Sequence, residues 1–138
     1  PTFNEAQSGR DAFIIRLAEM YMIAAEAEMN LGNKTKAADL INVLRTRAAL
    51  PGKEADMQVS ASDMTIDFIL DERAREFAGE QLRWFDLKRT GKLVERVKKY
   101  NLAAVAFVQD FHNIRPIPQK QIDAVTNKSE FIQNPGYK

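Results

Sequence analysis

The sequence predicts an all-α fold, and three observations lead to that prediction. Apolar side chains recur at the three- and four-residue spacing of helices over most of the 138 residues. Glycine or proline follows the expected helices, as at Gly32, Pro51 and Gly91. The connection at Gly32-Asn33 is short, so the first two helices should form an antiparallel hairpin.

Length and composition fit one globular domain over residues 1–138. The formal net charge of +1 gives no overall field that would favour nucleic acid or an anionic membrane. The chain has no cysteine, which excludes disulfides, thiolate metal sites and cysteine nucleophiles. No apolar run approaches the length of a bilayer span. The start at Pro1, without methionine or a secretion signal, indicates a mature or truncated piece.

The first half of the chain should form a helix pair. Residues 1–10 are polar and unpatterned, and we expect them to be extended. A long helix is expected over residues 11–31, with Gly32 after it and a small-residue face that permits close helix packing, formed by Ile14, Leu17, Ala18, Tyr21, Ala24, Ala25 and Ala27. The second helix should run from Lys34 to about Leu50. The pair resembles half of a tetratricopeptide-like unit.

A third helix should follow the loop at residues 53–62. Ser60 or Ser62 can cap it, with Asp63 in its acidic first turn. We expect this helix to bend near Gly79 and to continue over residues 82–89.

Arg73 lies in the apolar seam of this third helix, at helical spacing from Leu70 and Phe77. A guanidinium there is costly unless a carboxylate meets it, so the sequence predicts a buried ion network between helices. Glu19 and Glu26, on one face of the first helix, are the preferred partners. The alternative is a set of exposed ion pairs on a solvated helix. It accounts well for the glutamates but poorly for the position of Arg73 among apolar residues.

The C-terminal part should contain shorter elements. Residues 92–100 form a basic helix, with Leu93, Val94 and Val97 inward. Residues 101–113 are apolar but show no regular spacing. The two prolines of Arg115-Pro116-Ile117-Pro118 should hold that segment rigid and extended and prevent a helix from running through it. Residues 119–125 give one or two helical turns. The turn at residues 133–137 can fix the C-terminus in place by burying Tyr137. We also expect the aromatic side chains of Trp84, Phe85 and Tyr100 to lie in the core.

The residues do not assemble a catalytic or metal site. His112 is the only histidine, without the partners that a triad or a histidine metal site needs. The glutamates lack the Glu-x-x-His pairs of a carboxylate metal site, and no glycine-rich phosphate loop is present. The basic aromatic stretch at residues 83–89 could attract nucleic acid, but Trp84 and Leu87 have the spacing of packed residues. We therefore expect no enzyme activity, no cofactor, no metal and no nucleic-acid partner.

Four stretches, in order along the chain, resemble signatures of the C-terminal region of the SusD/RagB family. They are residues 16–27, residues 72–91, Pro116-Ile117-Pro118 and residues 133–137. One departure is visible: the family usually has glycine where this chain has Gln81, and a larger residue where it has Gly79.

The resemblance implies a nutrient-binding lipoprotein on the surface of the outer membrane, whose lipid anchor lies in an absent N-terminal part. Such proteins bind oligosaccharides or other nutrients and cover a SusC-like TonB-dependent transporter. The implied fold is all-α, with tetratricopeptide-like helix hairpins, additional C-terminal helices and irregular loops. The family's sugar-contacting aromatics come largely from outside these signatures, so no ligand-binding residue is assigned. The matching charged residues are assigned to the structural ion network: Glu19, Glu26, Arg73, Glu76, Arg83 and Asp86.

The leading hypothesis is therefore a non-catalytic glycan-binding and uptake component, of which this chain is the helical scaffold. A tetratricopeptide-type module that binds a protein partner in a helical groove is the alternative. An enzyme that uses the glutamate cluster is a third hypothesis.

Overall fold

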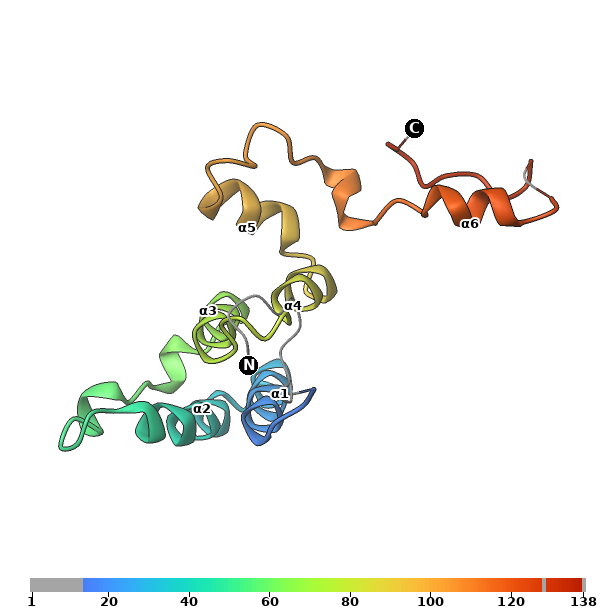
Figure 1. Cartoon of the computed structure of the whole chain (residues 1–138). Coiled ribbons are helices and arrows are strands. Elements are labelled where there is room, and N and C mark those ends of the chain that lie inside the picture. The colour runs from blue at the N-terminus through green and yellow to red at the C-terminus, as the bar shows by residue number, and fades with distance from the viewer. Residues whose placement is uncertain (1–13, 128, 138) are drawn as a thin grey trace, which may run out of the picture. The chain divides into compact units, whose positions relative to one another are not determined.

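A computed structural model of the chain describes residues 14–127 and 129–137. These residues form α-helices and short 3-10 helices and contain no strand, which confirms the all-α prediction (Figure 1). The extended segment expected at residues 1–10, and the expected helix start at residue 11, lie outside the described residues. The chain divides between Gln81 and Leu82 into two compact units. A single domain over residues 1–138 stays a prediction.

The first unit begins with a helix hairpin made of α1 (Leu17–Asn30) and α2 (Lys34–Ala48), which pack against each other. Gly32 closes α1 with a φ of +85°, a conformation that costs a residue without a Cβ very little. Its amide donates to the Met29 carbonyl (3.0 Å), and the Asn33 amide donates to the Glu28 carbonyl (2.8 Å). This paired arrangement satisfies carbonyls at the helix end and fixes the tight turn. The predicted hairpin is confirmed.

Small residues bring the two helices together. Ala25 and Ala37 are fully buried at the hairpin, and the largest fully buried side chains of the unit are Met22, Ile41, Met64, Ile69 and Leu70. The predicted inward face of α1 is wrong in part. Ala18 and Ala25 are buried, but Leu17 is 70 % exposed. Because α1 is apolar on two sides, spacing alone did not identify the buried side.

The third helix, α3 (Ile66–Glu76), starts later than predicted. Thr65 caps it, because its Oγ1 accepts a hydrogen bond from the Phe68 amide (3.2 Å). Two short 3-10 turns precede it, η1 (Ala55–Met57) and η2 (Ala61–Asp63). The Ser60 amide donates to the Asp63 carboxylate (2.8 Å), so Ser60 serves the second turn rather than the helix.

The bend predicted near Gly79 is a complete break between helices. α3 ends at Glu76, and α4 (Arg83–Arg89) begins after two left-handed residues, Gly79 (φ +83°) and Gln81 (φ +61°). A helix cannot continue through residues with positive φ.

The second unit contains α4, α5 (Leu93–Tyr100), the 3-10 turn η3 (Asp110–Asn113) and α6 (Gln119–Ala124). α4 packs on α5, and α5 packs on η3. Leu93 and Val94 are buried as predicted, but Arg96 is more buried than Val97. Phe85 and Tyr100 are 66 % and 58 % exposed, so their predicted core positions are wrong. These short elements cover too little surface to bury every aromatic ring.

Residues 133–137 pin the C-terminal segment. The Gln133 side chain accepts from the Ile117 amide (2.7 Å) and donates to the Ile117 carbonyl (2.9 Å). The hydroxyl of Tyr137 donates to the Ile114 carbonyl (2.6 Å), and its ring meets the Phe111 ring edge-on (4.9 Å). Tyr137 is half-buried by these contacts.

Candidate functional site: the arginine–glutamate clusters of the first unit

Arg73 extends from α3 into the interior of the first unit, where only 3 % of it is exposed. Its Nη2 donates to Oε1 of Glu19 on α1 (2.7 Å). The guanidinium also lies over the Phe77 ring, 5.0 Å from the ring centre. The pair therefore ties α1 to α3 in an apolar setting, where its charges are poorly screened.

Glu76, at the end of α3, lies between two guanidiniums. Its Oε1 is 2.5 Å from Nη1 of Arg16 and 2.5 Å from Nη2 of Arg47. Arg16 also bonds both carboxylate oxygens of Glu80 through Nε (3.0 Å each). This cluster connects the start of α1, the last turn of α2 and the end of α3.

The contacts shift the pKa of two cluster members, Glu76 and Arg16. Burial opposes ionisation of Glu76, but the hydrogen bonds from Arg47 and Arg16 outweigh it and hold the pKa of Glu76 below its ordinary value. The hydrogen bond to Glu80 raises the pKa of the Arg16 guanidinium, against the opposing effect of burial. Both shifts favour the charged form of the group.

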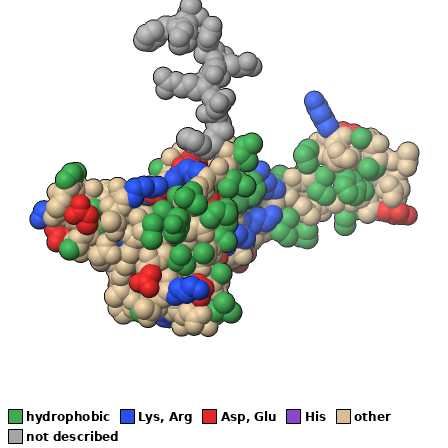
Figure 2. All heavy atoms as spheres, turned by 90° about the horizontal axis from the view of Figure 1, so that it is seen from below, with side chains coloured by type: hydrophobic (Ala, Val, Ile, Leu, Met, Phe, Trp, Pro, Cys, Tyr) green, Lys and Arg blue, Asp and Glu red, His purple; other side chains and the backbone are tan. Residues whose placement is uncertain are grey.

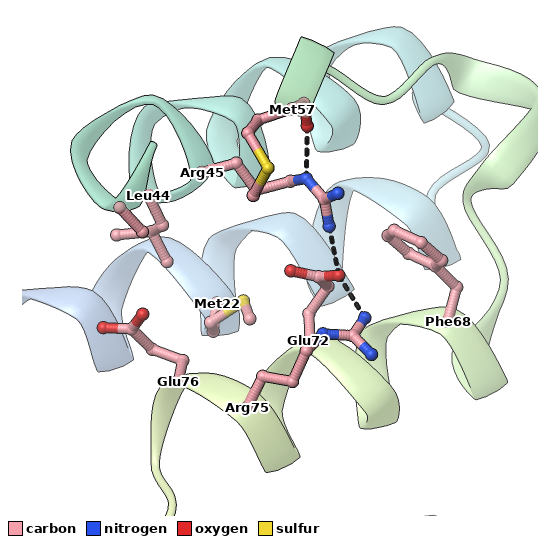
Figure 3. A pocket seen from close by; sticks show the side chains of 9 residues that line it. Met22, Leu44, Arg45, Met57, Phe68, Glu72, Arg75 and Glu76 are labelled. Atoms are coloured by element: carbon pink, nitrogen blue, oxygen red, sulfur yellow. Dashed lines mark hydrogen bonds and ion pairs between the residues drawn. The ribbon is translucent and has the colours of Figure 1, made fainter. Parts of the chain in front are cut away.

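Glu72 forms a second cluster one turn before Glu76. It accepts from Nη1 of Arg45 (2.5 Å) and from Arg75 of its own helix. The Nε of Arg45 donates to the Met57 carbonyl (2.5 Å), so one guanidinium joins α2, α3 and η1 (Figure 3). Arg45, Glu72 and Arg75, together with Met22 and Phe68, are among the residues that line a cavity of about 440 Å³ in the first unit.

The six residues predicted for the ion network fall into both units. Arg73 and Glu19 meet directly, whereas Glu76 binds Arg16 and Arg47. Glu26 is half-buried on α1. In the second unit, Arg83 is half-buried at the start of α4, and the buried Asp86 pairs with Arg89 one turn along (3.1 Å).

Helix α2 contributes two cluster members that no interpretation of the sequence considered, Arg45 and Arg47. Basic residues in the last turn of a helix are common because they favour the helix dipole, so they attracted no separate interpretation. The available signal was a match of opposite charges: two arginines stand near the end of the second helix, and two glutamates, Glu72 and Glu76, stand one turn apart on the third.

The contacts described at this site are ion pairs and hydrogen bonds that join helices. In the described part of the chain, no group of three or more histidine, aspartate or glutamate side chains is placed to hold a metal ion. His112 stacks on Phe111 (4.2 Å), and its Nδ1 accepts from the Gln109 amide (2.9 Å), which gives it a local structural role. Among residues 14–127 and 129–137, no helix has both the length and the apolar character needed to span a bilayer.

Comparison with known proteins identifies the family. The model of the SusD family matches residues 1–137. SusD-like protein P38 of Formosa agariphila is 40 % identical over 59 % of the chain, and SusD-like protein P25 of the same organism is 32 % identical over the whole chain. The starch-binding protein SusD of Bacteroides thetaiotaomicron is 31 % identical, also over the whole chain.

The chain spans 17 %, 26 % and 24 % of the lengths of these three relatives, respectively. No solved structure matches it. Because the family model covers nearly every residue and the similarity to two of these relatives extends over the full chain, the chain belongs to the SusD family.

Proposed function

We propose that these 138 residues are the C-terminal helical scaffold of a non-catalytic, nutrient-binding protein of the SusD type. The observation that carries the proposal is the family match over residues 1–137. One relative is named a starch-binding protein, which supports an oligosaccharide as the nutrient. The ligand-binding residues lie, in this proposal, outside the 138 residues.

The proposal includes a place and a partner for the whole protein. It is held on the surface of the outer membrane by a lipid anchor outside these residues, and it acts with a SusC-like TonB-dependent transporter. Family membership supports both statements. The net charge of +1 gives no reason to add a nucleic-acid partner.

The arginine–glutamate clusters support a structural role rather than catalysis. A carboxyl group that acts as a general acid near neutral pH needs a raised pKa. The pKa of Glu76 is lowered instead, and both Glu72 and Glu76 are bound by guanidiniums from two helices. In this role the charged side chains hold α1, α2 and α3 together.

Calorimetry of the full-length protein tests the proposal. We expect binding to members of a glycan panel that begins with linear starch oligosaccharides, and no binding by the 138-residue chain alone. Absence of binding to every glycan and nutrient tested would contradict the nutrient-binding role. Equal affinity of the 138-residue chain would contradict the scaffold role.

Chromatography of glycans incubated with the full-length protein tests the absence of catalysis. We expect the glycans to remain intact. Cleavage products that disappear in a folded Glu76→Gln variant would instead support an enzyme.

A further inference from the structure

The cavity of about 440 Å³ is formed by the first unit alone, because all of its lining residues lie between Met22 and Glu76. Helices α1, α2 and α3 and the turn η1 each contribute side chains to it. Its size is in the range of pockets that hold small molecules. The composition of its lining therefore indicates which kind of molecule would fit.

More than half of the lining residues are apolar. Met22 and Leu44 are buried, and Met57 and Phe68 are half-buried. Methionine side chains adapt to ligands of different shape, and a phenylalanine ring offers a large apolar surface. This part of the lining suits the apolar body of a ligand.

Two arginines meet one glutamate at the cavity. Oε1 of Glu72 accepts a hydrogen bond from Nη1 of Arg45 (2.5 Å) and another from Nη2 of Arg75, so two positive charges share one carboxylate oxygen (Figure 3). Glu76, the second acidic residue of the lining, is already paired with two further arginines. One positive charge is therefore in excess beside Glu72.

Both arginines keep N–H groups for a ligand. Within the described part of the chain, no residue accepts a hydrogen bond from Nη2 of Arg45 or from Nε or Nη1 of Arg75. Asp63 also interacts with the charge of Arg45, but its carboxylate is held by the Ser60 amide (2.8 Å) and does not line the cavity. The excess charge is therefore available to an anion in the cavity.

The charge and geometry of these groups match a carboxylate. A guanidinium binds a carboxylate through two parallel N–H groups. One positive charge in excess suits a monoanion better than a phosphate monoester, which carries about −1.5 to −2 at neutral pH. The formal net charge of the chain is only +1, and Figure 2 shows acidic as well as basic side chains on one face, so the excess at the cavity is local.

We propose that this cavity is a binding site for a small hydrophobic carboxylic acid. Arg45 and Arg75 hold its carboxylate, and Met22, Met57 and Phe68 contact its apolar part. This ligand belongs to another chemical class than the glycan of the proposed function. Failure of this site would therefore leave the nutrient-binding role untouched.

Titration of the full-length protein with octanoate tests the proposal. The ¹³C-methyl NMR signals of Met22 and Met57 report on the cavity, and that of Met29 on α1, which does not line it, is the reference. We expect the two cavity signals to shift to saturation while the reference stays in place. Absence of these shifts would overturn the proposal.

Two matched compounds separate the parts of the ligand. Octan-1-ol has a chain of the same length without the carboxylate, and acetate has the carboxylate without the chain. Each should bind at least about tenfold more weakly than octanoate, because charge-assisted hydrogen bonds and buried methylene groups both contribute to affinity. Binding of either compound as tightly as octanoate would overturn the proposed recognition.

Two variants test the direct contact with the carboxylate. Arg75→Gln removes one guanidinium of the cavity, while Glu72 keeps its other arginine. Arg47→Gln makes the same change of charge at a residue that does not line the cavity, and Glu76 also keeps one arginine. We expect octanoate binding to weaken by about tenfold in Arg75→Gln and by less than about threefold in Arg47→Gln. Equal affinities in the two variants would overturn a seat for the carboxylate at Arg75.

Discussion

Arg73 carries a positive charge in the apolar seam between α1 and α3, and Glu19 is positioned to meet it there. Arg73→Met removes one partner of a buried pair and leaves a carboxylate in a setting of low polarity. We expect the free energy of unfolding to fall by about 3–5 kcal/mol, measured by denaturant unfolding.

Arg75→Met is the matched control, because the same substitution two residues away removes a side chain that is 60 % exposed. Its partner Glu72 is buried but keeps its pair with Arg45, so no carboxylate is left without a cation and the loss should stay near that of an exposed pair, about 0–1 kcal/mol. Equal losses of unfolding free energy in the two variants would show that the burial of Arg73 does not determine how much it contributes to stability.

Gln81 is the described residue other than glycine with a positive φ, at +61°. This conformation crowds the Cβ of an L-residue and costs about 1–2 kcal/mol. Glycine has no Cβ, so Gln81→Gly should relieve the strain. The greater freedom of glycine in the unfolded chain offsets part of the gain, and we expect stability to rise by up to about 1 kcal/mol.

Gln81→Ala is the control for this substitution, because alanine keeps the Cβ and therefore the strain. Thermal melting of both variants would distinguish the two causes. An increase in Tm for Gln81→Ala as large as that for Gln81→Gly would mean that loss of the side chain, and not relief of the backbone, is responsible.

At the scale of elements, the end of the described chain is held by contacts with the 3-10 turn η3 and with loop residues, among them Phe111 and Ile117. Gly136 has a φ of +91°, and a Cβ built on it would lie 2.4 Å from Cγ of Phe111. Gly136→Ala should therefore displace Phe111 and Tyr137 and weaken the nearby bond from the Ile117 amide to Gln133. We expect faster hydrogen exchange of the Ile117 amide, measured by NMR.

Gly91→Ala provides the comparison, since Gly91 also has a positive φ (+68°) but has open space around its Cβ position. It carries the same kind of backbone strain without the clash. If Gly91→Ala accelerated exchange at Ile117 as strongly as Gly136→Ala does, the contact with Phe111 would not be the cause.

At the scale of the whole molecule, ion pairs between residues far apart in sequence make the stability of the first unit depend on pH. Glu76 has a pKa below its ordinary value of 4.5 because Arg47 and Arg16 stabilise its charged form. A lowered pKa in the folded state adds stability above the unfolded pKa. That stability is lost as the pH falls through the folded pKa.

Glu76→Gln should therefore be less stable than the unchanged chain at pH 7. The difference should begin to shrink as the pH falls below about 4.5, where the unfolded chain takes up a proton at Glu76, and should disappear once the folded protein is protonated there as well. Urea unfolding across this range measures the effect, with the exposed Glu54→Gln as control. A difference that stays constant down to pH 2 would contradict the ionic cause.

Much of the fold follows from local patterns in the sequence. The hairpin follows from the apolar spacing and from Gly32, and Arg73 is marked as unusual by its place among Leu70 and Phe77. The partners of the charged residues do not follow in the same way. Arg45 meets Glu72 across 27 residues and Arg16 meets Glu80 across 64, distances over which spacing rules carry no information.

The sequence by itself determined the helical class, the turn at Gly32 and the family signatures, because helix periodicity and glycine conformations act within a few neighbouring residues. Only the tertiary structure decided which apolar face of α1 is buried, where α3 stops, and which arginine each glutamate binds. These outcomes depend on how side chains from separate helices fill one space and compete for it.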